Sequence, residues 1–150
     1  MSLSKSLVSE AIHDALKRSR TEFPNISNFI LLQPTSPQRT LIDIENAIKM
    51  FKKNKHENLI SISEPINHPS EMISFSKNKY SFLIKKKKQM NRQEYKQFYF
   101  INGSIFIGSI NKFLKNKNFL DDKTIFFKMD KKNSIDINDE FDRKLVKNFL

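Results

Sequence analysis

The 150-residue sequence contains no cysteine and only two glycines, Gly103 and Gly108. The missing cysteines exclude disulfides, thiolate metal sites and cysteine nucleophiles. Two isolated glycines cannot build the glycine-rich loop that cradles phosphates in many proteins. No apolar run approaches the roughly 18 residues of a membrane-spanning helix, and the N-terminus has no basic segment followed by an apolar one. We therefore expect a cytoplasmic protein that does not enter a membrane.

Acidic residues are in the minority: the sequence has 16 Asp and Glu but 27 Lys and Arg, which gives a net charge of +11. Such a charge fits a nucleic-acid-binding module. However, only 5 of the basic residues are arginine, the side chain that makes bidentate contacts to phosphate and guanine. The densest cluster, Lys85–Lys88, fits either a solvated loop between strands or an anion-binding site. We therefore disfavour nucleic acid as a partner.

Length and composition predict one domain over residues 1–150, with 14 Phe to build its core. Apolar periodicity predicts the α/β class. Helices are expected at 5–20, from Thr40 to about 51, near 109–114 and at 139–150. Strands are expected at 29–33, 59–63, 80–84, 97–101, 104–107 and 124–129.

The order of these elements predicts how the strands connect. The strand–helix–strand order over 29–63 favours a right-handed crossover between neighbouring parallel strands, with 29–33 buried. Asn102-Gly103 is a strong turn signal between two strands. The composition changes after Pro65, and residues 66–100 are typical of an antiparallel excursion.

The decamer LLQPTSPQRT, from Leu31 to Thr40, joins a buried strand to a rigid polar loop and then to a helix. Its two prolines fix the loop before any ligand arrives. Thr40 with Asp43 three residues later predicts a capping box. Ligands of α/β sheets bind beyond the carboxyl ends of the strands. Gln33 lies at that end, where its amide could meet sugar hydroxyls or base edges, or simply cap the strand.

Three further positions could carry chemistry. The planar fork of Arg92 suits a carboxylate or phosphate, although an arginine beside a lysine run is more often a surface residue. Asp136 and Asn138 share one side of an extended segment, where their oxygens could hold Mg²⁺ beside a nucleotide phosphate. Asp139 fits the N-cap of the last helix.

Four segments together resemble the motifs of the acylneuraminate cytidylyltransferases in order and approximate spacing. The decamer is similar to the family's LLQPTSPLRT, and the pair Arg92-Gln93 to its RQ pattern. Asn102–Ile107 resembles NGAIY, and Ser134–Asp139 resembles SIDID. The resemblance runs from about residue 6 to 150. It implies a partial Rossmann-like nucleotidyltransferase sandwich that transfers CMP from CTP to a sialic acid or related nonulosonic acid.

The same resemblance implies partners and roles for individual residues. It implies a homodimer in which the protruding segment, about 66–100, reaches the partner's site. Gln33 would contact the sugar acid and Arg92 its carboxylate. The other implied substrate-binding positions are Asn102, Phe106 and Phe119, and the implied Mg²⁺ ligands are Asp136 and Asn138.

Three departures from the family pattern bear on activity. Asn138 replaces a second aspartate, which lowers the expected metal affinity. Phe106 replaces a common tyrosine and removes a hydroxyl from the sugar pocket. The ARxGSKG-like loop that grips the CTP triphosphate has no counterpart in the sequence. We therefore expect an N-terminally truncated member that is inactive alone or depends on a second chain. The alternative is a non-catalytic remnant or dimerising sugar-binding partner; the sequence leaves the sugar itself open.

Overall fold

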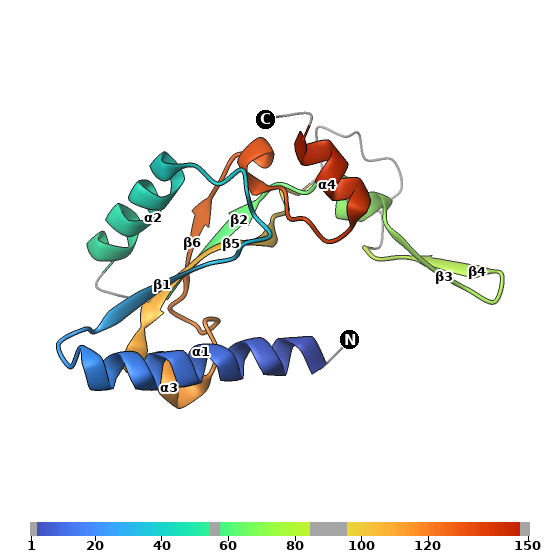
Figure 1. Cartoon of the computed structure of the whole chain (residues 1–150). Coiled ribbons are helices and arrows are strands. Elements are labelled where there is room, and N and C mark those ends of the chain that lie inside the picture. Colours follow the sequence, from blue (N-terminus) through green and yellow to red (C-terminus); the bar gives the residue numbers. More distant parts are fainter. Residues whose placement is uncertain (1–2, 55–57, 85–95, 148–150) are drawn as a thin grey trace.

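A four-stranded mixed sheet forms the centre of the computed structural model, which describes residues 3–54, 58–84 and 96–147 (Figure 1). The spatial order of its strands is β1 (Asn28–Leu32), β5 (Phe100–Ser109), β2 (Leu59–Ser63) and β6 (Ile125–Lys128). β5 is antiparallel to both of its neighbours, whereas β2 and β6 are parallel. The predicted α/β class is confirmed.

The strands predicted at 29–33 and 59–63 run in the same direction, as expected, but the prediction that they pair with each other is wrong. Both strands exist, but β5 lies between β1 and β2 and pairs antiparallel with each. β1 is therefore an edge strand of the described sheet, and its residues are mostly half-buried rather than buried. Local periodicity cannot reveal this order, because β5 comes from much later in the chain.

Helices cover both faces of the sheet and produce two apolar clusters (Figure 1). α2 (Leu41–Lys53) packs on one face, and α1 (Leu3–Glu22) and α3 (Ile110–Asn116) pack on the other. The first cluster contains Ala47, Phe51, Leu59, Ile105, Ile107 and Met129. The second contains Leu16, Ile60, Ile110, Phe113 and Phe119. Neighbouring residues of one strand, such as Leu59 and Ile60, fill different clusters because side chains alternate across a sheet.

The predicted helix starts are confirmed by their caps. The Thr40 hydroxyl accepts a hydrogen bond from the Asp43 backbone N–H at 3.1 Å, and the Asp43 carboxylate accepts one from the Thr40 N–H at 2.9 Å. This is the reciprocal capping box. Asp139 caps α4 (Glu140–Lys147) by accepting from the Asp142 N–H at 2.9 Å. The helices expected at 5–20 and near 109–114 correspond to α1 and α3.

The predicted turn at Asn102-Gly103 is wrong, and so is the break between strands at 97–101 and 104–107. One strand, β5, runs through both residues. Its pairing with β2 shifts register between Ile60 and Ile62, so extra residues of β5 bulge from the ladder. Gly103 has a φ of +74° within this bulge. The freedom of glycine at positive φ therefore serves a bulge here, not a hairpin.

A two-stranded antiparallel ribbon projects from the body of the protein (Figure 1). It consists of β3 (Ile73–Ser76) and β4 (Lys79–Phe82). Lys77 and Asn78 form its tip with φ values of 48° and 58°, the left-handed pair of a tight hairpin turn. The predicted antiparallel excursion is confirmed, and β4 overlaps the strand expected at 80–84. Its partner β3 was not identified from the sequence.

Two short 3₁₀ segments complete the described elements: η1 (Pro69–Glu71) leads into the ribbon, and η3 (Lys131–Ser134) follows β6. β6 itself corresponds to the strand expected at 124–129. Within the described ranges, no helix has the length and apolar character needed to cross a membrane.

Candidate functional site

Gln33 follows the last residue of β1 and lies against the bulge of β5. A Cβ atom placed on Gly103 would come within 2.8 Å of the Gln33 Oε1 atom. The positive φ of +74° therefore favours glycine at position 103, and a larger residue would also displace the end of the Gln33 side chain. Gln33, the first predicted site residue, is thus held at the carboxyl end of a strand by a neighbouring strand.

Arg39, from the same decamer, connects the ends of two strands. Its Nη1 atom donates to the backbone carbonyl of Gln33 at 3.2 Å and to that of Ser104 at 2.7 Å. Partial burial lowers the pKa of the Arg39 guanidinium, while the nearby Asp43 carboxylate raises it. The sequence did not single out Arg39, because a contact to a residue 65 positions away has no local signal.

The side-chain amide of Asn102 is fully occupied by protein groups. Its Oδ1 atom accepts from the Ser61 hydroxyl at 2.6 Å and from the Ser104 N–H at 3.1 Å. Its Nδ2 group donates to the Ser134 hydroxyl at 3.1 Å. Asn102 is also only 1% exposed. It can therefore influence a ligand only through the shape that it gives to the bulge and to the segment after η3.

That segment contains the predicted metal ligands and is tied to the decamer. The Ile137 N–H donates to the Thr35 carbonyl at 2.8 Å, which joins the first and last of the motifs. The Asn138 N–H donates to the Asp142 carboxylate at 2.9 Å, so the segment is also fixed to the start of α4. Asp136 lies between η3 and α4 and close to the decamer loop.

The oxygen atoms around Asp136 fit a small cation only in part. Asp136 Oδ1 is buried and has no hydrogen-bond partner among the described residues. Asn138 Nδ2 donates to the Asp136 carbonyl at 3.3 Å, so the Asn138 side chain turns toward Asp136. In the part of the chain that is described, no three His, Cys, Asp or Glu residues group into a metal site. An ion at Asp136 would need further ligands from a bound molecule.

The two predicted aromatic residues pack together. The rings of Phe106 and Phe119 are 5.1 Å apart, and Phe119 also contacts Phe29 and Phe113. Phe119 is 8% exposed and belongs to the cluster beneath α1 and α3. A Cβ atom on Gly108 would lie 3.3 Å from the Phe119 ring. The aromatic pair thus belongs to this apolar cluster, and Phe106 lies directly beside the bulge of β5.

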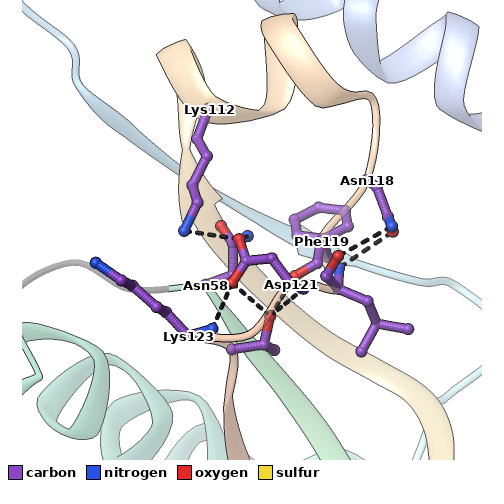
Figure 2. A network of polar contacts seen from close by, with 8 residues as sticks. Asn58, Lys112, Asn118, Phe119, Asp121 and Lys123 are labelled. Carbon is purple, nitrogen blue, oxygen red and sulfur yellow. Dashed lines mark hydrogen bonds and ion pairs between the residues drawn. The ribbon is translucent and has the colours of Figure 1, made fainter.

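The loop that carries Phe119 is held by a polar network centred on Asp121, shown in Figure 2. The Asp121 carboxylate accepts from Lys112 Nζ at 2.7 Å and from Asn58 Nδ2 at 3.0 Å. The hydrogen bond from Lys112 is the main cause that lowers the pKa of the Asp121 carboxyl below its usual range. The Thr124 hydroxyl donates to the Phe119 carbonyl at 2.8 Å and closes the loop. No local sequence pattern predicts this network.

Two other predictions do not join this arrangement. Arg92 and the lysine cluster lie outside the described residues.

A cavity of 660 Å³ opens beyond β2 and contains none of the predicted site residues. Its lining includes Glu64, His68 and Lys131. Lys128 Nζ lies 2.7 Å from the Glu64 carboxylate, and its hydrogen bond lowers the pKa of Glu64.

Comparison with known proteins agrees with the motif resemblance. An N-acylneuraminate cytidylyltransferase of Streptococcus agalactiae is 31% identical over 126 residues, which cover 83% of this chain and 30% of that protein. The corresponding enzyme of Escherichia coli is 31% identical over 134 residues, or 87% of this chain and 32% of that protein. This chain is homologous to the N-acylneuraminate cytidylyltransferases. It spans about a third of their length.

A third relative has a different name. The post-translational flagellin modification protein B of Campylobacter coli is 30% identical over 140 residues, covering 90% of this chain and 58% of that protein. No family model matches the sequence. Homology to cytidylyltransferases therefore rests on these pairwise similarities and on the motifs that the fold brings together.

Proposed function

We propose that this chain supplies the sugar-acid side of a cytidylyltransferase site. In the proposed reaction CMP passes from CTP to a nonulosonic acid. The sugar's anomeric hydroxyl attacks the α-phosphate, the bond to the β-phosphate breaks and pyrophosphate leaves. The observation that carries the proposal is the hydrogen bond of Ile137 to Thr35, which brings the two most distinctive motifs together at the end of β1. Homology to N-acylneuraminate cytidylyltransferases supports the substrate class.

The proposed roles follow from the chemistry of each side chain. The Gln33 amide offers donors and an acceptor to sugar hydroxyls. Phe106 and Phe119 supply an apolar wall, and Asn102 shapes the bulge beside it. Arg92, outside the described residues, would pair with the sugar carboxylate.

Asp136 and Asn138 would hold Mg²⁺. The Asp136 Oδ1 atom has no partner in the described part of the chain. This supports the role, because an unsatisfied buried carboxylate oxygen is costly unless a ligand pairs with it. The ion, when bound, offsets negative charge on the phosphates of CTP. Asn138 contributes no charge, so we expect weaker metal binding than a pair of carboxylates gives.

We propose that polypeptide outside these 150 residues grips the triphosphate, because two separate glycines cannot form a glycine-rich phosphate cradle. We propose that the described sheet is part of a nucleotidyltransferase sandwich completed by that polypeptide. The edge position of β1 supports this, since an apolar edge strand is an open site for a further strand.

We further propose that the ribbon of β3 and β4 forms a homodimer. The register places Ile73 opposite Phe82 and Phe75 opposite Tyr80, so four apolar side chains share one face. Phe75 and Tyr80 are 67% and 66% exposed. A two-stranded ribbon is marginally stable alone, and a patch of this kind marks an interaction surface.

The test is binding followed by turnover. The purified chain should bind N-acetylneuraminic acid in calorimetry, and Gln33→Ala with an unchanged circular dichroism spectrum should lose that binding. Pyrophosphate release should appear only after adding CTP, Mg²⁺ and the part of the Streptococcus agalactiae relative that this chain does not match. If neither sugar binding nor pyrophosphate release occurs, the proposal is wrong.

A second candidate function is a non-catalytic, dimerising sugar-binding partner. Asn138 favours this candidate, because an amide in place of a metal-binding carboxylate should lower the catalytic rate more than it lowers the affinity for the sugar. The same experiment separates the two functions: sugar binding without pyrophosphate release, in the presence of the added fragment, supports the second candidate.

A further inference from the structure

The ladder between β1 and β5 ends at the pair Leu32 and Ile105. Beyond this pair the bulge carries β5 away from the line of β1, and the backbone groups can no longer meet directly. The Arg39 guanidinium lies between the two strands there and bridges them. Its Nη1 atom donates to the Gln33 carbonyl on one strand and to the Ser104 carbonyl on the other, at 3.2 and 2.7 Å.

The backbone of Gln33 is consequently fixed, and its side chain lies against Gly103. Its carbonyl is held by Arg39, and it also accepts from the Ser36 N–H at 3.3 Å, which closes the start of the loop. Its side-chain Oε1 atom rests in the space left by the missing Cβ of Gly103. A shift of β5 relative to β1 would therefore move Gly103, against which the Gln33 amide lies.

We infer that Arg39 is a positioning residue for sugar-acid recognition: it holds the ends of β1 and β5 so that the Gln33 amide keeps its orientation over Gly103. This inference rests on the proposed function, because it gives Gln33 the task of contacting the sugar acid. Arg39 itself does not touch the sugar. Its forked, planar donor group matters, since a lysine ammonium lacks that fixed geometry.

The first test compares Arg39→Lys and Arg39→Gln with the wild-type chain by ¹H–¹⁵N NMR. The Gln33 side-chain NH₂ resonance is assigned from its loss in Gln33→Ala. Both Arg39 variants should shift that resonance, and Arg39→Lys should do so while its overall spectrum stays folded. Arg18→Gln on the exposed face of α1 removes a charge without touching the site and should leave it unchanged.

The second test measures N-acetylneuraminic acid binding by the same proteins well below their thermal midpoints. Arg39→Lys should weaken binding by about tenfold, the value of one hydrogen bond to a charged group. If Arg39 only stabilises the fold, its variants should have a lower thermal midpoint but the same Gln33 resonance and the same sugar affinity in the folded fraction. That result would overturn the inference. If Arg39→Lys moves the resonance but the wild-type chain binds no sugar, the proposed function fails and the positioning geometry stands.

Discussion

The Ser61 hydroxyl donates to Asn102 Oδ1 at 2.6 Å and also accepts from the Ile105 N–H at 2.8 Å. One side chain of β2 thus pairs with both ends of the β5 bulge. The pair is buried, with both residues at 1% exposure or less. Backbone groups that the bulge withdraws from the ladder are satisfied by side chains, so the bulge is a built feature of the sheet.

Asn102→Ala should destabilise the protein by about 2–3 kcal/mol, because it removes the acceptor of two buried donors, the Ser61 hydroxyl and the Ser104 N–H. Urea denaturation followed by circular dichroism measures the change. Asn116→Ala, at the exposed end of α3, is the matched control and should change stability by less than about 0.5 kcal/mol. Equal midpoints for the two variants would contradict the role of Asn102.

Gly103→Ala should cost about 1–2 kcal/mol, chiefly from the positive φ and to a smaller extent from the displacement of Gln33 Oε1 by the new Cβ atom. A double-mutant cycle separates the two causes. In a Gln33→Ala background the contact disappears and only the backbone strain remains, so Gly103→Ala should be less costly there. Identical costs in both backgrounds would show that the Gln33 amide does not rest on Gly103.

Which parts of the fold could be predicted depends on how far apart the interacting residues lie. Thr40 with Asp43, and Asp139 with Asp142, are neighbours in sequence, so their helix caps followed from spacing alone. The position of β5 between β1 and β2 depends on pairing between strands that are far apart in the sequence, so spacing alone could not predict it. The pair Asn102-Gly103 does not distinguish a hairpin from a bulge, because both use a glycine at positive φ and only the strand register decides between them.

The candidate site divides in the same way. Gln33 and Asp136 could be named from their motifs and from strand ends, where polar side chains are often functional. Arg39 could not be singled out, because its importance comes from two carbonyls on different strands. Asp121 gave no signal either, since Lys112 and Asn58 approach it only in the folded chain.

Asp121 should contribute to stability in a pH-dependent manner. Its carboxyl pKa is lowered in the folded protein, chiefly by the hydrogen bond from Lys112. The stabilisation is therefore present above the unfolded value of about 3.9 and is lost as the pH falls through the lowered folded pKa. Asp121→Asn should flatten the acid limb of a midpoint-against-pH curve between about pH 2 and 5.

Glu10→Gln on α1 provides the control for Asp121→Asn, because Glu10 is exposed and its carboxyl is not part of that network. The Glu64 carboxyl, whose pKa is also lowered, remains in both variants and gives the same background. An acid limb as steep in Asp121→Asn as in Glu10→Gln would exclude a role for the Lys112 contact in acid stability.

Phe75→Asp should weaken self-association if the ribbon forms the proposed dimer. The substitution places a charge in the centre of the apolar face, opposite Tyr80. We expect the dimer dissociation constant from sedimentation to rise at least tenfold, or about 1.4 kcal/mol. Ser74→Asp puts the same charge on the other face of β3 and should have a smaller effect. An equal response to both variants would place the interface elsewhere.

Asn138→Asp should strengthen binding of Mg²⁺ in the presence of CTP. The substitution restores a second carboxylate beside the unpaired Asp136 Oδ1 atom, and a charged oxygen ligand binds this hard cation more tightly than an amide oxygen. Calorimetric titration of the variant should show a Mg²⁺ affinity about tenfold higher, equivalent to roughly 1.4 kcal/mol. The gain should disappear in the Asp136→Asn background if both residues share one ion. A gain of the same size in that background would mean that the new carboxylate binds Mg²⁺ independently, and Asp136 would lose its proposed role.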